Sequence, residues 1–382
     1  MTNIKHGAAL LLTLCLIVSM TSCSRLQPPA SEPETEAVTA QPTEPPEEDK
    51  LDKLLGSMTI EEKVGQMFLV RCPDVDAAQY ITDYHLGGFI LFGRDFADKT
   101  TEQVSHDIQS YQKSSVKVPM LIAVDEEGGD VVRVSDNPNL YSEAFPSPKT
   151  VFENGGWEAV DATENEKAQL LLSLGVNVNM APVCDVTVNE DSFMYSRSFS
   201  GDVDEVNTFV TKTVNICKEK RLGTVLKHFP GYGDNDDTHE GVAVDFRTLD
   251  SFRKTDFLPF KAGIEAGADC VLVSHNLVVC MDDDKPASLS PKVHEILRHE
   301  LDFNGVIITD DLAMEGVAHD ADEGSVAVEA VKCGNDLLCC SDVETQYPAV
   351  LAAVQSGEIT EEQVDLSVRR VLQWKQHLDL IS

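Results

Sequence analysis

The chain has 382 residues, enough for one large or two average domains, and 42% of them are hydrophobic. It contains 30 Lys and Arg against 65 Asp and Glu, so its formal net charge is −35. Nucleic-acid binding depends mainly on Lys and Arg that neutralise phosphates. The composition therefore predicts a soluble globular protein, argues against nucleic acid as a partner and favours an uncharged substrate.

Residues 1–22 have the layout of a signal peptide. Lys5 supplies a positive charge, and the mostly apolar run from Ala8 to Met20 is too short to cross a bilayer as a stable helix. The run Met20-Thr21-Ser22-Cys23 resembles a bacterial lipoprotein cleavage site, which implies that Cys23 carries a lipid. The alternative is ordinary secretion with Cys23 as a free thiol.

Residues 23–50 form an acidic, proline-rich stretch that we expect to be a tether. Such a composition cannot bury enough apolar surface to fold. The folded domain is therefore expected at residues 51–382. Its eight cysteines form no CxxC pair, so we expect most of them to be buried thiols, with one or two disulfides left open. They are Cys72, Cys184, Cys217, Cys270, Cys280, Cys333, Cys339 and Cys340.

Eight apolar runs of strand length recur along the domain, and segments with helical spacing separate most of them. The runs are Gln66–Val70, Gly88–Phe92, Met120–Val124, Val176–Val183, Thr224–Leu226, Cys270–Val273, Val306–Ile308 and Leu337–Cys340. The helical segments include Thr101–Gln112, Ala159–Leu174, Val203–Lys220, Leu249–Ala266, Lys292–Leu301 and Gly324–Cys333. Apolar strands alternating with amphipathic helices indicate an α/β fold with a parallel sheet, and eight such strands predict a single closed (β/α)₈ TIM-type barrel.

Polar residues follow each run at its C-terminal end, where a barrel would bring them together at one mouth. They are Arg71, Arg94, Asp95, Asp125, Glu126, Glu127, Asp185, Lys227, His228, His275, Asp310, Asp311, Ser341 and Asp342. No GxGxxG or GxxxxGK[ST] pattern opens a helix, so nucleotide binding lacks its main sequence signal.

The densest polar segment is Lys227–Gly241, which we expect to be a loop because it holds three glycines and a proline. Asp237 and His239 lie two residues apart, so they point the same way in an extended chain. A carboxylate beside an imidazole orients the ring, raises its proton affinity and supplies an acid and base near neutral pH. The alternatives are a solvated acidic turn or a divalent-metal loop built from Asp234, Asp236 and Asp237, although calcium-loop spacing is absent.

A second candidate is Gly305–Met314, where a buried run delivers the adjacent carboxylates Asp310 and Asp311 to the mouth. Successive side chains at a strand end diverge, so only one should face the cavity. That carboxylate could attack an electrophilic carbon or stabilise a cation. The other is expected to cap the following helix.

These motifs together resemble glycoside hydrolase family 3, in its single-domain β-N-acetylglucosaminidase branch. The resemblance covers residues 51–382. It rests on Thr59–Met67, Val124–Gly129 with Arg133, Leu174–Asn177, Ala181–Asp185, Arg197–Phe199, Lys227–Gly231 with Asp237–His239, Pro286–Ser290 and Thr309–Met314.

The resemblance implies a retaining exo-β-N-acetylglucosaminidase. Asp310 matches the nucleophile of a covalent glycosyl-enzyme, His239 the acid/base and Asp237 its partner; retention needs the nucleophile and the proton donor on opposite faces of the sugar. For His275, a structural role is an equal alternative to sugar binding. The residues implied to bind the terminal N-acetylglucosamine are Asp125, Arg133, Arg197, Lys227, His228 and His275.

The predicted signal peptide and the family resemblance together indicate the biological setting. We expect a monomer outside the cytoplasm, held to the cell membrane only by its lipid anchor, that needs no metal or other cofactor. Its substrates would be peptidoglycan fragments or amino-sugar oligosaccharides ending in N-acetylglucosamine. Many relatives add a second α/β domain that supplies a Glu acid/base, and a chain ending at Ser382 leaves no room for one, which agrees with the histidine-loop type.

One position departs from the family pattern, and four alternatives stay open. Asp130 stands where the family commonly has Arg, which weakens a nearby salt bridge or substrate contact. The chain could instead be a β-N-acetylglucosaminide phosphorylase or a β-glucosidase of the same family. It could also use the substrate's acetamido group with Asp310 and Asp311, or be an inactive glycan-binding lipoprotein.

Overall fold

The computed structural model describes residues 50–234, 243–314, 317 and 323–381. The predicted signal peptide, Cys23 and the tether up to residue 49 lie outside these ranges, as do Asp237 and His239. The compact unit that contains the described residues spans Glu48–Ser382. None of the helices in the described ranges is long and apolar enough to cross a membrane.

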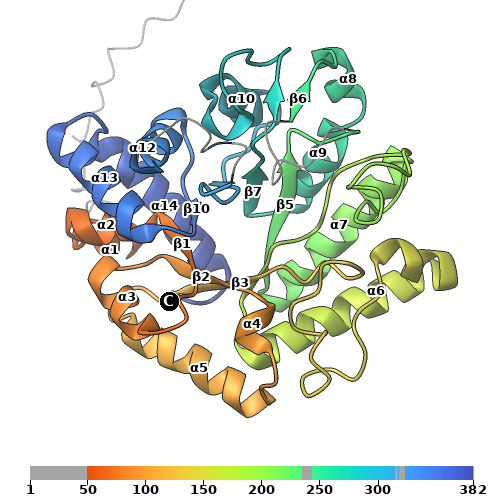
Figure 1. Cartoon of the computed structure of the whole chain (residues 1–382), viewed down its shortest axis with the longest axis horizontal. Coiled ribbons are helices and arrows are strands. Elements are labelled where there is room, and N and C mark those ends of the chain that lie inside the picture. The colour runs from red at the N-terminus through yellow and green to blue at the C-terminus, as the bar shows by residue number, and fades with distance from the viewer. Residues whose placement is uncertain (1–49, 235–242, 315–316, 318–322, 382) are drawn as a thin grey trace, which may run out of the picture. The chain divides into compact units, whose positions relative to one another are not determined.

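Eight parallel strands form the barrel that the sequence predicts (Figure 1). The strands of the molecule are β1 (Phe68–Arg71), β2 (Gly88–Leu91), β3 (Leu121–Val124), β4 (Val178–Asn179), β5 (Gly223–Phe229), β6 (Val244–Asp245), β7 (Cys270–Val273), β8 (Leu277–Val278), β9 (Val306–Thr309) and β10 (Leu338–Cys340). The order around the barrel is β10-β1-β2-β3-β4-β5-β7-β9, and a parallel bridge between Ile308 and Leu337 joins β9 to β10. Strands β6 and β8 pair separately, outside the barrel.

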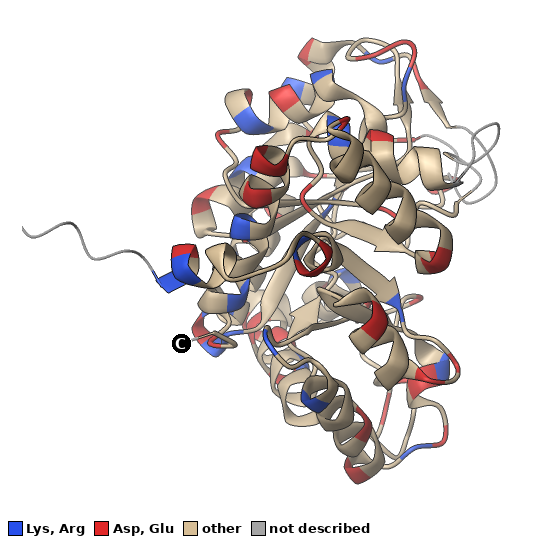
Figure 2. Cartoon of the chain, turned by 90° about the vertical axis from the view of Figure 1, so that its left-hand side faces the viewer, with Lys and Arg blue, Asp and Glu red and all other residues tan. Residues whose placement is uncertain are grey.

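Helices surround the strands and connect most of them (Figure 1). They are α1 (Lys50–Gly56), α2 (Ile60–Gln66), α3 (Ala77–Tyr84), α4 (Gly93–Phe96), α5 (Thr101–Ser114), α6 (Pro148–Leu174), α7 (Val203–Lys220), α8 (Leu249–Lys254), α9 (Phe257–Ala266), α10 (Pro291–Glu295), α12 (Glu323–Cys333), α13 (Val343–Ser356) and α14 (Glu361–His377), with a 3₁₀ turn η1 (Ala287–Leu289) and a π-helical turn η2 (Ile296–Glu300). Asp and Glu are spread over these outer helices (Figure 2).

Local sequence signals explain where individual helices begin and end. Helix α2 starts with a capping box, because the Thr59 hydroxyl accepts from the Glu62 amide and the Glu62 carboxylate accepts from the Thr59 amide. Helix α7 starts after Asp202, whose carboxylate accepts from the backbone amides of Asp204 and Glu205 in the first turn. Helix α6 ends at Gly175, which adopts the left-handed conformation (φ 94°) that terminates helices.

The barrel interior is filled by apolar side chains from the strands and is closed at one end by α14. Leu69, Ile90 and Leu121 belong to this inner cluster, and so do Trp374 of α14 and Leu378, the residue that follows this helix. Because α14 packs against strand residues at the N-terminal side of the barrel, polar groups can gather at the opposite, C-terminal mouth.

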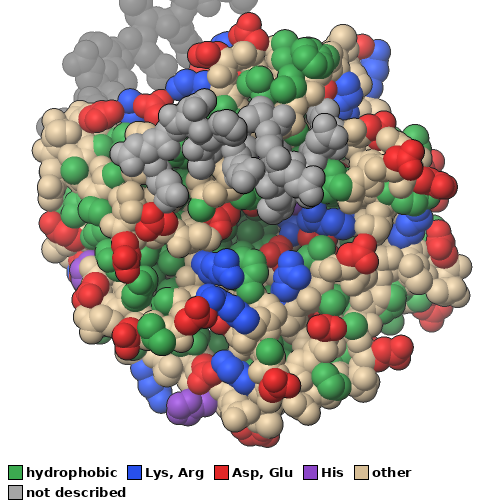
Figure 3. Space-filling model, in the orientation of Figure 1, with side chains coloured by type: hydrophobic (Ala, Val, Ile, Leu, Met, Phe, Trp, Pro, Cys, Tyr) green, Lys and Arg blue, Asp and Glu red, His purple; other side chains and the backbone are tan. Residues whose placement is uncertain are grey.

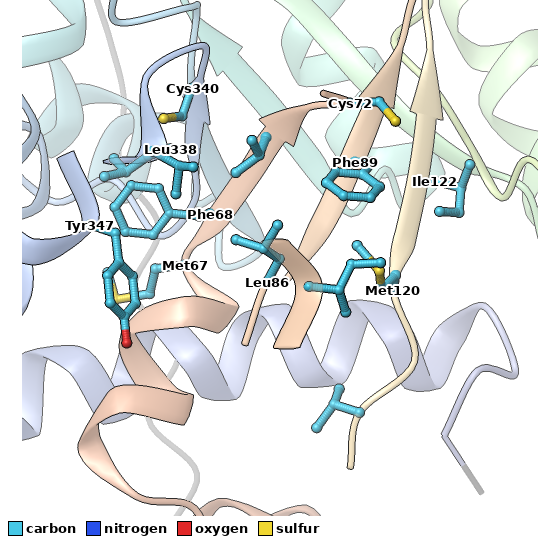
Figure 4. Close-up of a cluster of buried hydrophobic side chains, with 14 of the residues drawn as sticks. Met67, Phe68, Cys72, Leu86, Phe89, Met120, Ile122, Leu338, Cys340 and Tyr347 are labelled. Carbon is cyan, nitrogen blue, oxygen red and sulfur yellow. The ribbon is translucent and has the colours of Figure 1, made fainter. Parts of the chain in front are cut away.

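A second layer of apolar side chains lies between the strands and the outer helices (Figure 4). Phe68 and Phe89 project outward from neighbouring strands, and Tyr347 of α13 packs edge-on against Phe68 with ring centroids 5.9 Å apart. This layer fixes the helices on the barrel and leaves the strand ends free to carry function.

Several sequence-based boundaries were wrong. The expected loop at Lys227–Gly241 starts later, because β5 continues through Lys227 and His228 to Phe229. The run Val176–Val183 forms only the short strand β4, since Pro182 has no amide to donate and the Asn179 side chain bonds the backbone of Glu126. Helix α6 begins at Pro148 rather than Ala159, with a kink at Gly156.

The cysteines of the described residues are free thiols. Seven of them are buried and Cys280 is exposed. The disulfides that the sequence left open are therefore absent from this part of the chain, and the buried thiols pack as small apolar side chains.

Candidate active site

The ends of β3 and β5 carry a cluster of alternating charges. Lys227 Nζ lies 2.6 Å from Asp125 Oδ1 and 2.6 Å from Glu127 Oε1. Arg197 donates to both oxygens of Glu127, at 2.8 and 3.0 Å. The side chains of Lys227 and Glu127 are only 4% and 5% exposed, so these charges are paired inside the barrel mouth rather than in solvent.

Burial and ion pairing shift the pKa values of Glu127 and Lys227 in opposite directions, and the effect of ion pairing is the larger. Burial disfavours the charged form of Glu127, but Lys227 and Arg197 outweigh it and hold the pKa of Glu127 well below its ordinary value. Burial also disfavours charged Lys227, yet Asp125 and Glu127 raise the pKa of Lys227 above its ordinary value. Glu127 and Lys227 therefore stay ionised through the neutral pH range.

His228 is held beside the cluster in one orientation. Asp185 accepts from the backbone amide of His228 at 3.0 Å and from its Nδ1 at 2.8 Å. Arg197 Nη2 lies 3.2 Å from His228 Nε2. A carboxylate can only accept a hydrogen bond and a guanidinium can only donate one. We therefore assign the proton of the His228 ring to Nδ1, which donates to Asp185, and a lone pair to Nε2, which accepts from Arg197.

Glu126 shapes the loop that carries Arg133. Its buried carboxylate accepts from the amides of Arg133 and Val134, at 2.8 and 2.7 Å, and from Ser135. The Nε of Arg133 is buried without a hydrogen-bond partner among the described residues. A buried donor left in this state is available to a ligand that comes within its reach.

Asp310 and Asp311 play different parts after β9. The Asp311 carboxylate accepts from the amides of Ala313 and Ser341, at 3.0 and 3.2 Å, and from the Ser341 hydroxyl. It therefore ties the end of β9 to the end of β10. The half-buried Asp310 continues the sheet through its amide, which donates to Val273 O at 3.1 Å, and its carboxylate accepts from the Asp311 amide at 2.9 Å.

Asp125 and Asp310 directly follow β3 and β9, which are parallel strands of one barrel, so both lie at its C-terminal end. The Asp310 amide also bonds to β7, which lies between β5 and β9 in the barrel. Asp310 therefore shares one mouth with the Asp125–Lys227 pair, as the sequence predicts.

His275 follows β7 and is fully buried. Its Nδ1 lies 2.7 Å from the Ser288 hydroxyl, and its Nε2 lies 3.0 Å from the carbonyl oxygen of Asp311. Both ring nitrogens are thus engaged within the protein, which favours the structural alternative for this histidine over sugar binding.

Basic side chains are conspicuous at the mouth of an otherwise acidic protein. Figure 3 shows several Lys and Arg side chains close together near the middle of the face in view. At the ends of β1 and β2, the Arg71 guanidinium lies 4.8 Å from the ring centroid of Phe92, and Arg94 pairs with Asp74. Asp130 is exposed in the loop after β3.

Sequence reasoning missed two carboxylates that organise the site. Glu127 links Arg197 to Lys227, and Asp185 links His228 to the following loop. Both follow strands, but neither was assigned a role. The available signal was electrostatic, because Arg197 and Lys227 need buried carboxylates if they are to line the same pocket. Within the described ranges, no group of three or more His, Cys, Asp or Glu residues could hold a metal ion.

Glu127→Gln is expected to weaken both folding and substrate binding. The amide keeps the shape but removes the charge that Arg197 and Lys227 share, leaving buried cations undercompensated. We expect the unfolding free energy to fall by about 2 kcal/mol and the Michaelis constant to rise at least about tenfold. Urea unfolding and initial rates measure the two effects.

Asp161→Asn is the matched control for this substitution. Asp161 pairs with Lys212 at 2.8 Å, but the two side chains are 42% and 32% exposed. An exposed pair contributes less than about 1 kcal/mol, so this variant should unfold and bind almost as the unmodified protein does. Equal losses in the two variants would contradict a special role for the Glu127 cluster.

The fold and the site define the class of protein. A (β/α)₈ barrel with carboxylates and compensated cations at its C-terminal mouth is an enzyme architecture suited to a neutral, polyhydroxylated substrate. A family model for the glycosyl hydrolase family 3 N-terminal domain matches residues 59–374.

Curated relatives and solved structures agree with this match. The chain is 34% identical over 302 residues to a beta-hexosaminidase of Stenotrophomonas maltophilia, covering 76% of this chain and 86% of that protein. A beta-hexosaminidase of Methylobacillus flagellatus is 29% identical over 309 residues, covering 74% and 85%. A family 3 β-N-acetylglucosaminidase from a Paenibacillus species superimposes with a TM-score of 0.79 at 31% identity, covering 85% of this chain and 63% of that one.

The chain spans less than two thirds of the Paenibacillus protein but nearly all of a β-N-acetylhexosaminidase from Beutenbergia cavernae, where the coverage is 84% of this chain and 99% of that one. The TM-score of the latter is 0.73 at 27% identity. The chain belongs to glycosyl hydrolase family 3 and is a glycoside hydrolase.

Proposed function

We propose that this chain is a retaining exo-β-N-acetylglucosaminidase that releases terminal β-linked N-acetylglucosamine. The observation that carries the proposal is the Asp125–Lys227–Glu127–Arg197 cluster, which shares the barrel mouth with Asp310. Similarity to proteins named beta-hexosaminidase supports the choice of sugar. Predicted export past the cytoplasmic membrane supports peptidoglycan fragments or amino-sugar oligosaccharides as substrates.

The cluster suits an uncharged sugar because its charges compensate one another. Lys227 is balanced by Asp125 and Glu127, and Arg197 is balanced by Glu127. It therefore offers oriented donors and acceptors without a strong net charge. Charge-assisted hydrogen bonds of this kind fix the positions of sugar hydroxyls and hold the anomeric carbon in place.

The chemistry needs two further groups. Asp310 would attack the anomeric carbon and form a glycosyl ester, while His239 gives its proton to the departing oxygen. His239 would then take a proton from water, and the resulting attack on the anomeric carbon breaks the ester and returns Asp310. Asp237 would orient the imidazole. Two inversions at the same carbon retain the β configuration.

A substrate panel tests the proposed activity. We expect release of chromophore from an aryl N-acetyl-β-glucosaminide, at a kcat/KM at least about 100-fold above that for the matching aryl β-glucoside and β-xyloside, since a lost hydrogen-bonding group costs specificity of that order. Proton NMR should show the β sugar as the first product. Preference for the glucoside, or α sugar as the first product, would overturn the proposal.

Two additions to this assay separate the nearest alternatives. Added inorganic phosphate should leave the product unchanged, whereas sugar 1-phosphate would identify a phosphorylase. A fluorinated N-acetylglucosaminyl substrate that slows the second step should label Asp310, as peptide mass mapping would show. Absence of label from every carboxylate would favour participation of the substrate's acetamido group.

A further inference from the structure

Arg247 is the centre of a hydrogen-bonded network at the outer edge of the site. Its Nε donates to Asp245 Oδ2 at 2.9 Å, and its Nη1 donates to the two oxygens of Asp256 at 2.9 and 3.0 Å. Its Nη2 donates to the carbonyl oxygen of Gly231 at 3.1 Å, and the guanidinium lies 4.2 Å from the ring centroid of Phe252. One side chain thus joins residues that precede positions 235–242 to residues that follow them.

The chain before these positions runs tightly against the network. Gly231 and Gly233 both have positive φ, at 119° and 57°. A Cβ on Gly231 would lie 2.4 Å from Asp256 Oδ1, and a Cβ on Gly233 would lie 2.7 Å from the guanidinium carbon of Arg247. A side chain at either position would displace Asp256 or Arg247, so the glycines permit the close approach.

The same stretch is fixed on its other side to the sugar-binding cluster. The Tyr232 amide donates to Asp185 Oδ1 at 2.8 Å, and Asp185 Oδ2 accepts from His228. The Tyr232 ring packs edge-on against His228, with centroids 5.2 Å apart. Residues 231–233 are therefore held between Asp185 on one side and the Arg247 network on the other.

We propose that Arg247 is a positioning residue for catalysis, which fixes where the chain leaves β5 and where it returns at β6. Asp237 and His239 lie between these two points in the sequence. By holding Gly231 and Asp245 to one guanidinium, Arg247 sets the distance that the intervening residues must span and hence the placement of the acid/base. This inference rests on the proposed function of His239.

Arg247→Lys should weaken this placement without removing the positive charge. A lysine ammonium lacks the planar guanidinium with its several N–H donors, so it cannot donate hydrogen bonds to Asp245, Asp256 and Gly231 at once. A displacement of about 1 Å at a catalytic group can cost about 100-fold in rate. The loss should fall on proton transfer alone, because Asp310 and the Lys227 cluster are held by other contacts.

The experiment compares substrates whose leaving groups differ in their need for a proton. For aryl N-acetyl-β-glucosaminides, we expect Arg247→Lys to lower kcat/KM by about 10- to 100-fold with poor leaving groups and by less than about 3-fold with a dinitrophenolate, which departs without protonation. His239→Ala should give the same pattern in stronger form. Azide, which attacks without base assistance, should accelerate the variant and yield the β-glycosyl azide.

Arg253→Lys is the matched control. Arg253 lies on α8 and makes a bidentate pair with Glu300, at 2.6 and 2.8 Å, but its side chain is 48% exposed. Weakening this exposed pair should change neither the dependence of kcat/KM on the leaving group nor the response to azide. A uniform loss across leaving groups in Arg247→Lys, with no azide response, would overturn the inference.

A second variant keeps the test decisive if Arg247→Lys unfolds. Gly233→Ala retains every charge and disturbs the guanidinium through contact with the new Cβ and through strain at a left-handed φ, so it should give the same leaving-group pattern; a uniform loss there would also overturn the inference. If the unmodified protein and Arg253→Lys hydrolyse none of the N-acetylglucosaminides, the proposed function itself fails. If both hydrolyse them and the Arg247 and Gly233 variants lose activity uniformly, only the role of Arg247 fails.

Discussion

Asp310→Ala is expected to lower kcat/KM for aryl N-acetyl-β-glucosaminides by about 10⁴-fold or more, because alanine cannot form the glycosyl ester. The loss should be similar for good and poor leaving groups, since the nucleophile acts in the first step whichever group departs. Initial rates with the substrates of the panel measure it. Azide should enter the space left by the carboxylate and yield the α-glycosyl azide, a product opposite in configuration to that expected from the acid/base variants.

Asp311→Asn is the control that separates the two adjacent carboxylates. Asp311 bonds to Ala313 and Ser341, and an asparagine oxygen can still accept from an amide there. We expect a loss of stability of about 1 kcal/mol and activity within about tenfold of the unmodified protein, as for a change at a positioning contact. If Asp311→Asn were as inactive as Asp310→Ala, or if Asp310→Ala were fully active, the nucleophile would not be Asp310.

The fold was predictable because its strongest determinant is local. Each barrel strand is buried on both faces, so the sequence shows it as a nearly continuous apolar run, and each of the eight runs overlaps one barrel strand. Boundaries were less predictable, because they depend on partners elsewhere in the chain. Strand β5 extends to Phe229 although Lys227 and His228 are polar, since Asp125, Glu127 and Asp185 compensate them.

The sequence predicted which residues lie at the mouth of the barrel, but not which of them pair with one another. The sequence places Asp125, Lys227 and Asp310 at strand ends, and barrel geometry brings strand ends together. It does not show which carboxylate balances which cation, because that pairing depends on side-chain directions within the mouth. Glu127 and Asp185 were missed for this reason. The roles of Asp237 and His239 stay predictions, since neither residue is described by the structure.

Helix α14 shows a further limit of sequence patterns. A lysine in an amphipathic helix normally indicates the solvent face, and Lys375 gives no local sign of anything else. Yet its side chain is fully buried, because α14 covers the end of the barrel and packs against α2 as well. Lys375 Nζ donates to Gln66 Oε1 at 2.7 Å, and Gln66 Nε2 donates to the carbonyl oxygen of His85.

This burial should make the stability of the protein depend on pH. Burial lowers the pKa of Lys375 from 10.5 to about 7. Between those two values, the unfolded chain binds a proton that the folded chain does not, so the unfolding free energy rises with pH across this window. The contribution is smallest below pH 7, and a shift of this size corresponds to roughly 5 kcal/mol over the whole window.

Lys375→Met is therefore expected to stabilise the protein at pH 7 and to lose that advantage at high pH. Methionine fills the site without a charge to bury, but it leaves Gln66 Oε1 without its donor, at a cost of about 1 to 2 kcal/mol. The net gain at pH 7 should be about 3 kcal/mol. Near pH 10 the variant should be the less stable of the two, so the two stability curves should cross.

Urea unfolding of both proteins from pH 6 to pH 10 measures the crossing. Lys254→Met is the control, because Lys254 is 71% exposed beside Asp250 and should leave the pH dependence unchanged. A constant difference between Lys375→Met and the unmodified protein at every pH would mean that the lysine is charged in the folded state throughout. In that case water or a rearranged Gln66 would have to solvate the ammonium at the closed end of the barrel, and α14 would pack more loosely there than its buried Trp374 indicates.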